Sequence, residues 1–575
     1  MTKKISTKEY EEWSKDELIK EIVKIKSTTY GLVWHRDLPE EKIDILVNPD
    51  ARTPNEMFPN EMAGKPFPVL KEVKGKAIES DKTKLVNLLI EGDNYHSLAV
   101  LNFTHREAVD LIYIDPPYNT GNNDFIYNDK FVDKEDNFRH SKWLSFMEKR
   151  LKLAKNLLKS NGAIFISIDD HEQAPLRMLC DEIFGEDNFL ANFIWESKLT
   201  GGHDSTHVNT IHEYVLCYAK DSASQNVLNK RKSNTEYPQY DAVRKQNFKW
   251  DSLWTVSHGY TKNCDYPIFS PDNSEVFPWM CHKDKEKVKG IARWFWSKET
   301  YEENKKDLLV KKDKDGQWKV YKKVYGGSEI PFKSIFDKAL VGGTSNGKEE
   351  VENIFGEVKI FDNPKPVSLI KEVLRMSAPS DATILDFMAG SGTTGQAVLE
   401  SNKEDGGTRN FILCTNNGDE KSKHKIASDV CYPRIKKNII GYKSKKGEKI
   451  DGLGGNLKYY TTDFVEAEPT DKNKRKLVKE STDMLCILEN AFELIQETPE
   501  FKIFKNTDKY VGVIFYDEAI DDYKKAIKKI DGHFNTYVFS MNDDPHTVQF
   551  DDMKGKVSLK AIPEVVLKVY REIFK

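Results

Sequence analysis

The sequence predicts an α/β fold in which a doubly wound, largely parallel sheet is covered by helices on both faces. Short runs of apolar residues are typical of strands that are buried on both faces of such a sheet. They recur at residues 85–90, 109–114, 163–168, 383–385 and 410–415. Segments with apolar residues at helical spacing lie between these runs, and strands that alternate with helices favour a parallel sheet.

The helices expected between the strands follow from this spacing. They span residues 95–103, 143–159, 175–184, 367–376, 394–400 and 426–440. Asn161 and Gly162 follow the second of them, and a glycine just past the last turn is a common helix terminator. We therefore expect the helix of residues 143–159 to end at this pair.

A chain of 575 residues is too long for one ordinary domain, because domains of ~100–200 residues are usual. The expected order is an N-terminal arm at 1–80, the first part of the α/β core at 81–200, an insert at 201–350, the second part of the core at 351–450, and a small α/β domain at 451–575. Prolines disfavour helices and central strands in the arm, which begins with a charged helical stretch at 8–26.

The last part of the chain is expected to begin with a Lys- and Gly-rich linker or turn at 443–456. The C-terminal domain then follows. Its expected elements are helices at 476–497, 518–530 and 562–574 and strands at 510–516 and 536–540.

The composition places the chain among globular proteins. Charged residues make up 31% and the formal net charge is −4, which neither requires nor excludes a nucleic-acid partner. No apolar run reaches the roughly 20 residues that a membrane-spanning helix needs, and the first thirty residues lack the apolar core of a signal peptide. The seven cysteines include no Cys-x-x-Cys pair. We therefore expect a cytoplasmic protein with reduced thiols, no zinc site and no membrane contact.

A glycine-rich loop, Asp386-Phe387-Met388-Ala389-Gly390-Ser391-Gly392, follows the strand at 383–385. Gly390 and Gly392 allow the backbone to turn and to approach a ligand closely, and such turns bind nucleotide-like ligands in doubly wound folds. No Gly-Lys-Ser/Thr ends the loop, so it is not a phosphate loop. Asp386 suits the ammonium group of an amino-acid moiety. The alternative is a tight turn that Asp386 caps.

A second motif, Asp115-Pro116-Pro117-Tyr118, follows the strand at 109–114. The two prolines make the turn rigid and remove amide donors. A carboxylate, a free carbonyl and an aromatic ring are then held together, as the exocyclic amine of a base requires. The amine can donate to Asp115 and to the Pro116 carbonyl while Tyr118 stacks on the base, worth about 1–3 kcal/mol. The alternative is an Asp-Pro turn with Tyr118 at the edge of the core.

At these two motifs the chain resembles the S-adenosylmethionine-dependent DNA amino-methyltransferases of the beta order, in which the Asp-Pro-Pro-Tyr motif precedes the glycine motif. Over residues 85–200 and 351–442, for example at 87–94 and 411–417, it also resembles the modification subunit of type III restriction–modification systems. The resemblance implies a Rossmann-like sheet and methylation of the N6 atom of a flipped adenine in duplex DNA. It also requires the two motifs, distant in sequence, to meet at one edge of the sheet.

The resemblance also implies roles for individual residues. The catalytic motif is Asp115, Pro116, Pro117 and Tyr118, and the positions that match donor-binding residues are Asp386, Phe387, Ala389, Gly390, Ser391, Gly392, Thr393, Lys365, Pro366 and Asp93. Asp93 is equally suited to cap the helix at 95–103. The strand at 410–415 ends in Thr415-Asn416-Asn417 instead of an acidic residue, so no residue is assigned to the donor ribose. The acidic run at 169–172 can suggest a metal, but the chemistry needs none and we expect none.

The insert at 201–350 is the candidate for target recognition, with a structural elaboration as the alternative. It contains six of the ten tryptophans, and residues 221–350 hold 24 Lys and Arg against 19 Asp and Glu. The expected partners are duplex DNA, a second copy of the chain bound through the C-terminal domain, and a separate restriction subunit that carries the motor and nuclease. Methylation of cytosine N4, methylation of RNA and a non-catalytic DNA-binding specificity subunit remain as alternatives. Asp115 in place of Ser favours adenine.

Overall fold

The computed structural model describes most of residues 65–562, together with scattered residues between 14 and 50 and Val566. The gaps after residue 65 are at 82, 122–125, 128–129, 132–135, 199–206, 233–236, 258–259, 326–328, 419–422, 467, 507–508 and 540–545. The chain divides into two compact units, of which the smaller is Lys230–Phe332 and the larger contains the remaining residues. No helix in the described part of the chain is long and apolar enough to span a membrane.

A mixed sheet of eleven described strands forms the centre of the larger unit. The order is β1-β25-β3-β22-β21-β4-β7-β9-β8-β20, and β2 pairs with β25. The bounds are β1 Phe67–Glu72, β2 Ile78–Glu79, β3 Val86–Glu91, β4 Val109–Ile114, β7 Leu158–Ile168, β8 Phe189–Glu196, β9 His212–Ala219, β20 Ile335–Phe336, β21 Thr383–Asp386, β22 Asn410–Thr415 and β25 Asn456–Val465. The strands from β25 to β7 are parallel, while β1 and β9 run antiparallel to their neighbours.

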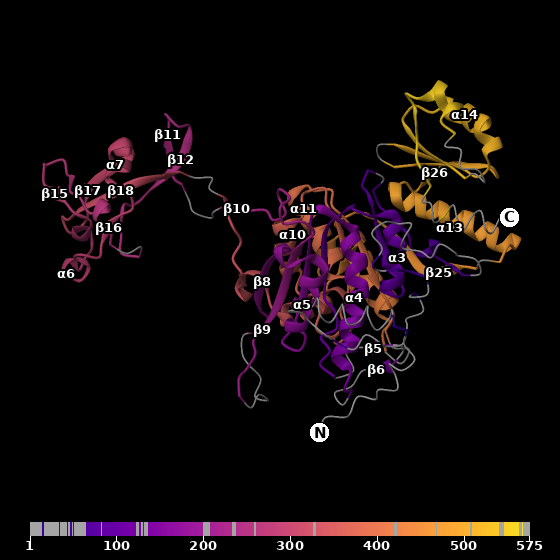
Figure 1. The fold of residues 1–575 in the computed structure, drawn as a ribbon, viewed down its shortest axis with the longest axis horizontal. Coiled ribbons are helices and arrows are strands. Elements are labelled where there is room, and N and C mark those ends of the chain that lie inside the picture. The colour runs from indigo at the N-terminus through magenta and orange to yellow at the C-terminus, as the bar shows by residue number, and fades with distance from the viewer. Residues whose placement is uncertain are drawn as a thin grey trace. The chain divides into compact units, whose positions relative to one another are not determined.

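Helices cover this sheet on both faces (Figure 1). The chain moves from β4 to β7 in one direction along the sheet and from β21 to β22 in the other. Because such crossovers are right-handed, the two connecting helices, α4 (Arg139–Leu157) and α11 (Thr393–Asp405), lie on opposite faces. The predicted doubly wound, Rossmann-like sheet is therefore confirmed. The other helices on this sheet are α3 Asn94–Thr104, α5 Gln173–Phe184, α8 Lys338–Val341, α9 Thr344–Phe355, α10 Val367–Ser377 and α12 Tyr432–Ile440.

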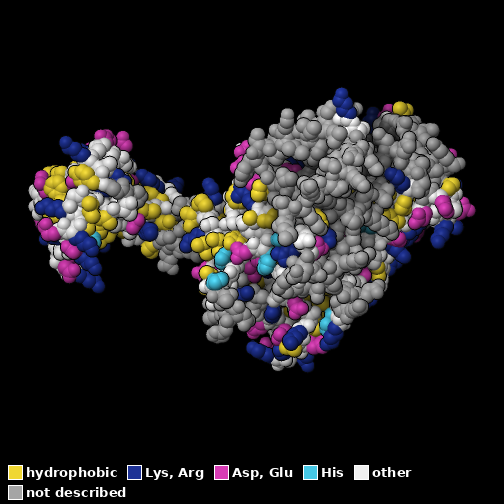
Figure 2. All heavy atoms as spheres, turned by 60° about the horizontal axis from the view of Figure 1, so that its bottom comes forward, with side chains coloured by type: hydrophobic (Ala, Val, Ile, Leu, Met, Phe, Trp, Pro, Cys, Tyr) yellow, Lys and Arg dark blue, Asp and Glu magenta, His cyan; other side chains and the backbone are white. Residues whose placement is uncertain are grey.

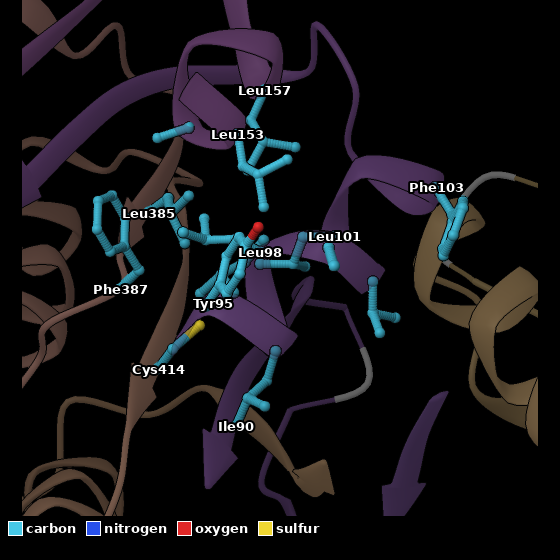
Figure 3. Close-up of a cluster of buried hydrophobic side chains, with 14 of the residues drawn as sticks. Ile90, Tyr95, Leu98, Leu101, Phe103, Leu153, Leu157, Leu385, Phe387 and Cys414 are labelled. Carbon is cyan, nitrogen blue, oxygen red and sulfur yellow. The ribbon is translucent and has the colours of Figure 1, made fainter. Parts of the chain in front are cut away.

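The core beneath the glycine loop is apolar and closed. Leu385 and Phe387 are fully buried and pack in one cluster with residues of α3 and α4 (Figure 3). The side chains labelled there are Ile90, Tyr95, Leu98, Leu101, Phe103, Leu153, Leu157, Leu385, Phe387 and Cys414. The side chain of Phe387 therefore anchors the loop, and its carbonyl oxygen accepts a hydrogen bond from Nδ2 of Asn94 at 3.0 Å.

Gly162 does not end a helix, contrary to the expectation from its position. Helix α4 ends at Leu157 and the chain continues at once as β7, in which Gly162 lies. The register between β4 and β7 shifts here, so that Gly162 comes close to the backbone of β4. A Cβ atom on Gly162 would lie 3.0 Å from the carbonyl oxygen of Val109. Tertiary packing, not helix termination, requires this glycine.

Both ends of the core sheet extend beyond the predicted boundaries. Strand β1 contains Pro68 and belongs to the sheet although it lies in the predicted arm; as an edge strand it tolerates a proline. Strand β25 lies beyond residue 450 and was not predicted, yet it pairs with β3. Before it, the predicted linker at 443–456 contains part of a hairpin of β23 (Gly441–Lys443) and β24 (Lys449–Asp451). The helical stretch expected at 8–26 lies almost entirely outside the described residues.

The C-terminal region forms a separate five-stranded sheet of order β26-β27-β28-β29-β30. Its elements are α13 Asp471–Glu489, β26 Glu493–Glu497, β27 Phe501–Lys505, β28 Tyr510–Ile514, α14 Ile520–Lys528, β29 Phe534–Val538 and β30 Val557–Leu559. The helix predicted to reach residue 497 ends at Glu489, where Asn490 adopts the left-handed conformation. The helix expected at 562–574 falls outside the described residues.

The smaller unit is built on a four-stranded antiparallel sheet of order β11-β12-β18-β17. These strands are β11 Gln239–Asp241, β12 Gln246–Ser252, β17 Leu308–Lys312 and β18 Trp318–Tyr325, and the longest helix beside them is α7 Lys298–Asn304. Trp294 is fully buried in its core. The unit is narrower than the predicted insert at 201–350, because β9, β20, α8 and α9 belong to the larger unit.

Candidate active site

The two motifs meet at one edge of the central sheet. Strands β4 and β21 are adjacent and parallel, with Leu111 paired to Ile384 and Ile112 paired to Leu385. Parallel neighbours end at the same edge of a sheet, so Asp115, which follows β4, and Asp386, which ends β21, lie close together. The negative charge of Asp115 contributes to the raised pKa of Asp386. The spatial meeting that the resemblance required is therefore observed.

Asp386 organises the glycine loop from within. Its Oδ1 accepts a hydrogen bond from the Met388 amide at 3.0 Å, and its Oδ2 accepts one from the Thr394 hydroxyl at 2.5 Å. Burial raises the pKa of Asp386 to about 7, and Asp115 adds to the shift. Asp386 therefore caps the turn, as the alternative interpretation expected. An ammonium group of a ligand would have to share its oxygens.

Gly390 and Gly392 both adopt backbone conformations that favour glycine, with φ of +49° and +83°. A Cβ atom on Gly390 would lie 3.0 Å from Cζ of Phe361, and one on Gly392 would lie 2.9 Å from Sγ of Cys431. Both the turn and the close packing thus exclude a side chain.

Arg434 of α12 holds the glycine loop through hydrogen bonds, a role that no pattern in the sequence predicts. Its side chain is fully buried. It donates to the hydroxyl oxygens of Ser391 at 2.8 Å and Thr393 at 2.9 Å, and to the Gln396 side chain at 2.8 Å. Burial lowers the pKa of Arg434. Ser391 and Thr393, both predicted to bind the donor, are thus held in place by a buried guanidinium.

Lys365 connects the two motifs. Its carbonyl oxygen accepts a hydrogen bond from the Thr393 hydroxyl at 3.3 Å, and its Nζ donates to Oδ2 of Asp115 at 2.8 Å. Pro366 follows as the N-cap of α10. Burial raises the pKa of Asp115, while Lys365 opposes this shift. Burial alone would lower the pKa of Lys365, but Asp115 and Glu213 outweigh it and raise the pKa. The ammonium group thus points to the catalytic motif.

Tyr118 is held by Glu213 of β9. The Tyr118 hydroxyl donates to Oε2 of Glu213 at 2.9 Å, and burial raises the pKa of Tyr118 well above its usual value. The carbonyl of Pro117 accepts a hydrogen bond from Nε1 of Trp143 at 2.7 Å. Pro116 itself is buried. Glu213 was missed in the sequence because nothing in its strand distinguishes it from other polar residues.

Glu172, the last residue of the acidic run at 169–172, supports the catalytic loop. Asn119 is fully buried at φ +57° and donates to Oε1 of Glu172 at 2.5 Å. The same oxygen lies 2.5 Å from Nδ1 of His140, and burial raises the pKa of Glu172. Within the described residues no group of three or more His, Cys, Asp and Glu side chains is arranged to hold a metal ion.

Asp93 caps helix α3, as the alternative interpretation expected. Its side chain accepts a hydrogen bond from the Tyr95 amide at 2.6 Å. Nη2 of Arg150 lies 3.4 Å away. The Asp93 side chain is nevertheless 56% exposed, which leaves room for a ligand at the end of β3.

A comparison with known protein families shows to which family the chain belongs. A family model described as DNA methylase matches residues 109–449, which include both motifs, both strands and the insert. The chain belongs to the DNA methylase family. The resemblance inferred from the two motifs is thereby confirmed.

Three curated relatives of this methylase are similar over much of the chain. It is 37% identical to the StyLTI Mod subunit of Salmonella typhimurium over 358 residues, which are 57% of this chain and 52% of the relative. It is 34% identical to the EcoPI Mod subunit of Escherichia phage P1 over 420 residues, 64% of this chain and 63% of the relative. It is 35% identical to the type II methyltransferase M.KpnI of Klebsiella pneumoniae over 384 residues, 62% of this chain and 90% of the relative. The match thus covers less than two thirds of either Mod subunit.

Proposed function

We propose that the protein transfers a methyl group from S-adenosylmethionine to the N6 atom of a flipped adenine in duplex DNA, as the modification subunit of a type III restriction–modification system. The parallel pairing of β4 and β21 carries this proposal, because it holds Asp115 beside the glycine loop. Two relatives are named as Mod subunits of type III enzymes, and a third is named as a methyltransferase.

The residues at the ends of β21 and β3 fit the methyl donor. Gly390 and Gly392 form a tight turn with positive φ at the end of β21, against which Phe361 and Cys431 pack, and Gly390 remains partly exposed. The partly exposed carboxylate of Asp93 lies at the end of β3 and is suited to polar groups of the donor. When bound, S-adenosylmethionine supplies an electrophilic methyl group.

The catalytic motif would prepare the target amine for attack. A base inside a duplex is out of reach, so it must leave the stack at a cost of a few kcal/mol. Asp115 and the Pro116 carbonyl then accept the two hydrogen bonds of the exocyclic amine, which concentrates its lone pair on nitrogen. Tyr118 stacks on the base. Because its ring is held in one orientation, it also orients the target amine toward the methyl group. Trp143 and Asn119 hold the backbone of this loop in place.

Sequencing of single DNA molecules tests this proposal directly. The gene is expressed in a host that lacks its own DNA methylases, with Asp115→Ala as the matched inactive variant. Modified adenine in one short motif is the expected result, present with the wild type and absent with the variant. Modified cytosine would move the assignment to the N4 atom, and unmodified DNA from a well-expressed wild type would overturn it.

The smaller unit is our candidate for target recognition. Hydrophobic and basic side chains lie next to one another on its surface (Figure 2). Lysine ammonium groups lie over several aromatic rings of this unit, among them Lys322 over Phe295 at 4.0 Å, Lys289 over Trp279 at 5.1 Å and Lys311 over Tyr321 at 5.1 Å. Such surfaces suit phosphates and base faces. Exchange of residues 230–332 with those of a relative should change the methylated motif, and an unchanged motif would reject this role.

The names of the two Mod subunits support a restriction subunit as partner, and the family resemblance supports self-association. We expect a separate restriction subunit to bind this chain, and a second copy to associate through the C-terminal sheet. Sedimentation of the full chain and of a chain that ends after β25 tests the second expectation. A dimer that persists without the C-terminal sheet would contradict it.

A further inference from the structure

Lys365 lies in the position on Asp115 that the target amine would need. Its Nζ is 2.8 Å from both carboxylate oxygens of Asp115. It also lies 4.9 Å from the centre of the Tyr118 ring. The Lys365 side chain is only 9% exposed, whereas Asp115 retains 28%. An N–H donor on this carboxylate and beside this ring satisfies the same groups that are proposed to hold an exocyclic amine.

The ammonium group and a target amine therefore compete for one carboxylate. A buried ammonium group that loses a close carboxylate without a replacement costs several kcal/mol, so Lys365 cannot simply release Asp115. Glu213 offers a second carboxylate, with Oε2 3.5 Å from Nζ of Lys365. A movement of ~0.7 Å would give this pair the 2.8 Å separation that Lys365 now has from Asp115.

Glu213 is also fixed by the catalytic motif itself. Its Oε2 accepts the hydrogen bond from the Tyr118 hydroxyl. The backbone of Lys365 is in turn bound to Thr393 of the glycine loop, so its ammonium group can move only between nearby partners. The carboxylate that could receive Lys365 is thus already oriented beside the ring on which the base is proposed to stack.

We propose that Glu213 is a positioning residue that receives the ammonium group of Lys365 when the target base enters. In the empty pocket Lys365 pairs with Asp115. As the amine of the base binds Asp115, Lys365 shifts to Glu213 and remains paired. This inference rests on the proposed function, because it assumes that an amine binds Asp115.

Glu213→Gln tests the charge of Glu213 without removing its hydrogen bond to Tyr118, since an amide oxygen accepts it as well. Lys365 would then lack a second carboxylate and stay on Asp115. We expect kcat/KM for DNA to fall by about 10- to 100-fold, because the amine is displaced from its position. Asp170→Asn is the matched control. Asp170 accepts a hydrogen bond at 2.9 Å from the hydroxyl of Tyr214, which lies next to Glu213 on β9. It should behave as the wild type.

Removal of the competing cation provides the decisive readout. In the double variant Glu213→Gln, Lys365→Met, the ammonium group no longer occupies Asp115, so kcat at the plateau of the pH profile should exceed that of Glu213→Gln alone. Lys365→Met should also move the acid limb of the profile to higher pH, because Asp115 loses the cation that lowers its pKa.

The outcomes separate the inference from the function on which it rests. If the wild type methylates no DNA, the proposed function fails. If the wild type is active and Glu213→Gln equals it, or the double variant is no faster than Glu213→Gln, the role of Glu213 is rejected. If Glu213 only holds the Tyr118 hydroxyl in place, Glu213→Gln should have normal activity, and adding Lys365→Met should not raise kcat.

Discussion

The two loops at the edge of the sheet are held in opposite ways. In the glycine loop, both oxygens of Asp386 bind residues two and eight positions further along the chain. In the proline loop, Asp115 pairs with Lys365, 250 positions away, and Tyr118 with Glu213, 95 positions away. The turn at Asp386 is thus closed by local hydrogen bonds, to which Arg434 adds bonds from 43 and 41 positions away, whereas the acidic and aromatic residues of the base side depend on more distant parts of the chain.

The largest effect is expected on the base side. Asp115→Ala should lower the rate of methyl transfer by about 10²- to 10³-fold, because the amine loses a polarising acceptor that is fixed in place. Binding of S-adenosylmethionine should change little, since the hydrogen bonds that hold the glycine loop come from Asp386 and Arg434 and not from Asp115. Single-turnover transfer and calorimetric titration of the donor measure the two quantities separately. A large loss of donor affinity would show that the two loops are not independent.

The pH dependence of stability should report on Asp386. Its pKa of about 7 in the folded state lies above the usual 3.8. The folded state therefore binds the proton more tightly, and this contribution to stability is present below about pH 4 and is lost as the pH rises through about 7. At ~1.4 kcal/mol per pKa unit it amounts to at most about 4 kcal/mol.

Asp386→Asn removes this titration and keeps a side-chain acceptor. The unfolding free energy of the wild type should therefore fall relative to that of the variant between about pH 4 and 7. Denaturant titrations of both proteins at several pH values give this difference. Parallel curves would show that Asp386 is ionised in the folded state throughout.

Gly390→Ala tests whether the glycine loop depends on the close packing of Phe361 against Gly390 as well as on a positive φ. A Cβ atom there would meet Phe361, so donor affinity should fall about tenfold, equivalent to ~1.4 kcal/mol. Gly406→Ala is the matched control, because Gly406 has φ +73° and nothing within 4 Å of a built Cβ. Both should lose roughly 1–2 kcal/mol of stability through the backbone. Equal donor affinities in the two variants would reject the contact.

The smallest effect separates the two roles of Asp93. Asp93→Ala should cost ~1 kcal/mol of stability through the lost cap of α3, while Asp93→Asn should cost little, since Asn caps equally well. If Asp93 also binds the donor through its charge, Asp93→Asn should weaken donor binding without affecting the thermal unfolding midpoint. If Asp93→Asn binds the donor as tightly as the wild type, Asp93 acts only as the cap of α3.

The sequence alone determined the features that depend on local chemistry. Apolar runs, the two prolines and the positive φ of Gly390 and Gly392 follow from the residues themselves, so the sheet, its parallel centre and the two loops could be predicted. Cap residues such as Asp93 belong to the same class, because their partners lie within a few positions of the chain.

Only the tertiary structure decided which distant residues complete the site. Glu213 and Arg434 look like ordinary polar residues of a strand and a helix until the fold places them beside Tyr118 and the glycine loop. Lys365, predicted as a donor-binding residue, is paired with Asp115 only in the folded chain. Gly162 was misread for the same reason, since its need for glycine comes from the backbone of β4. Strand pairing and side-chain burial join residues that are far apart in sequence, and no local pattern records such contacts.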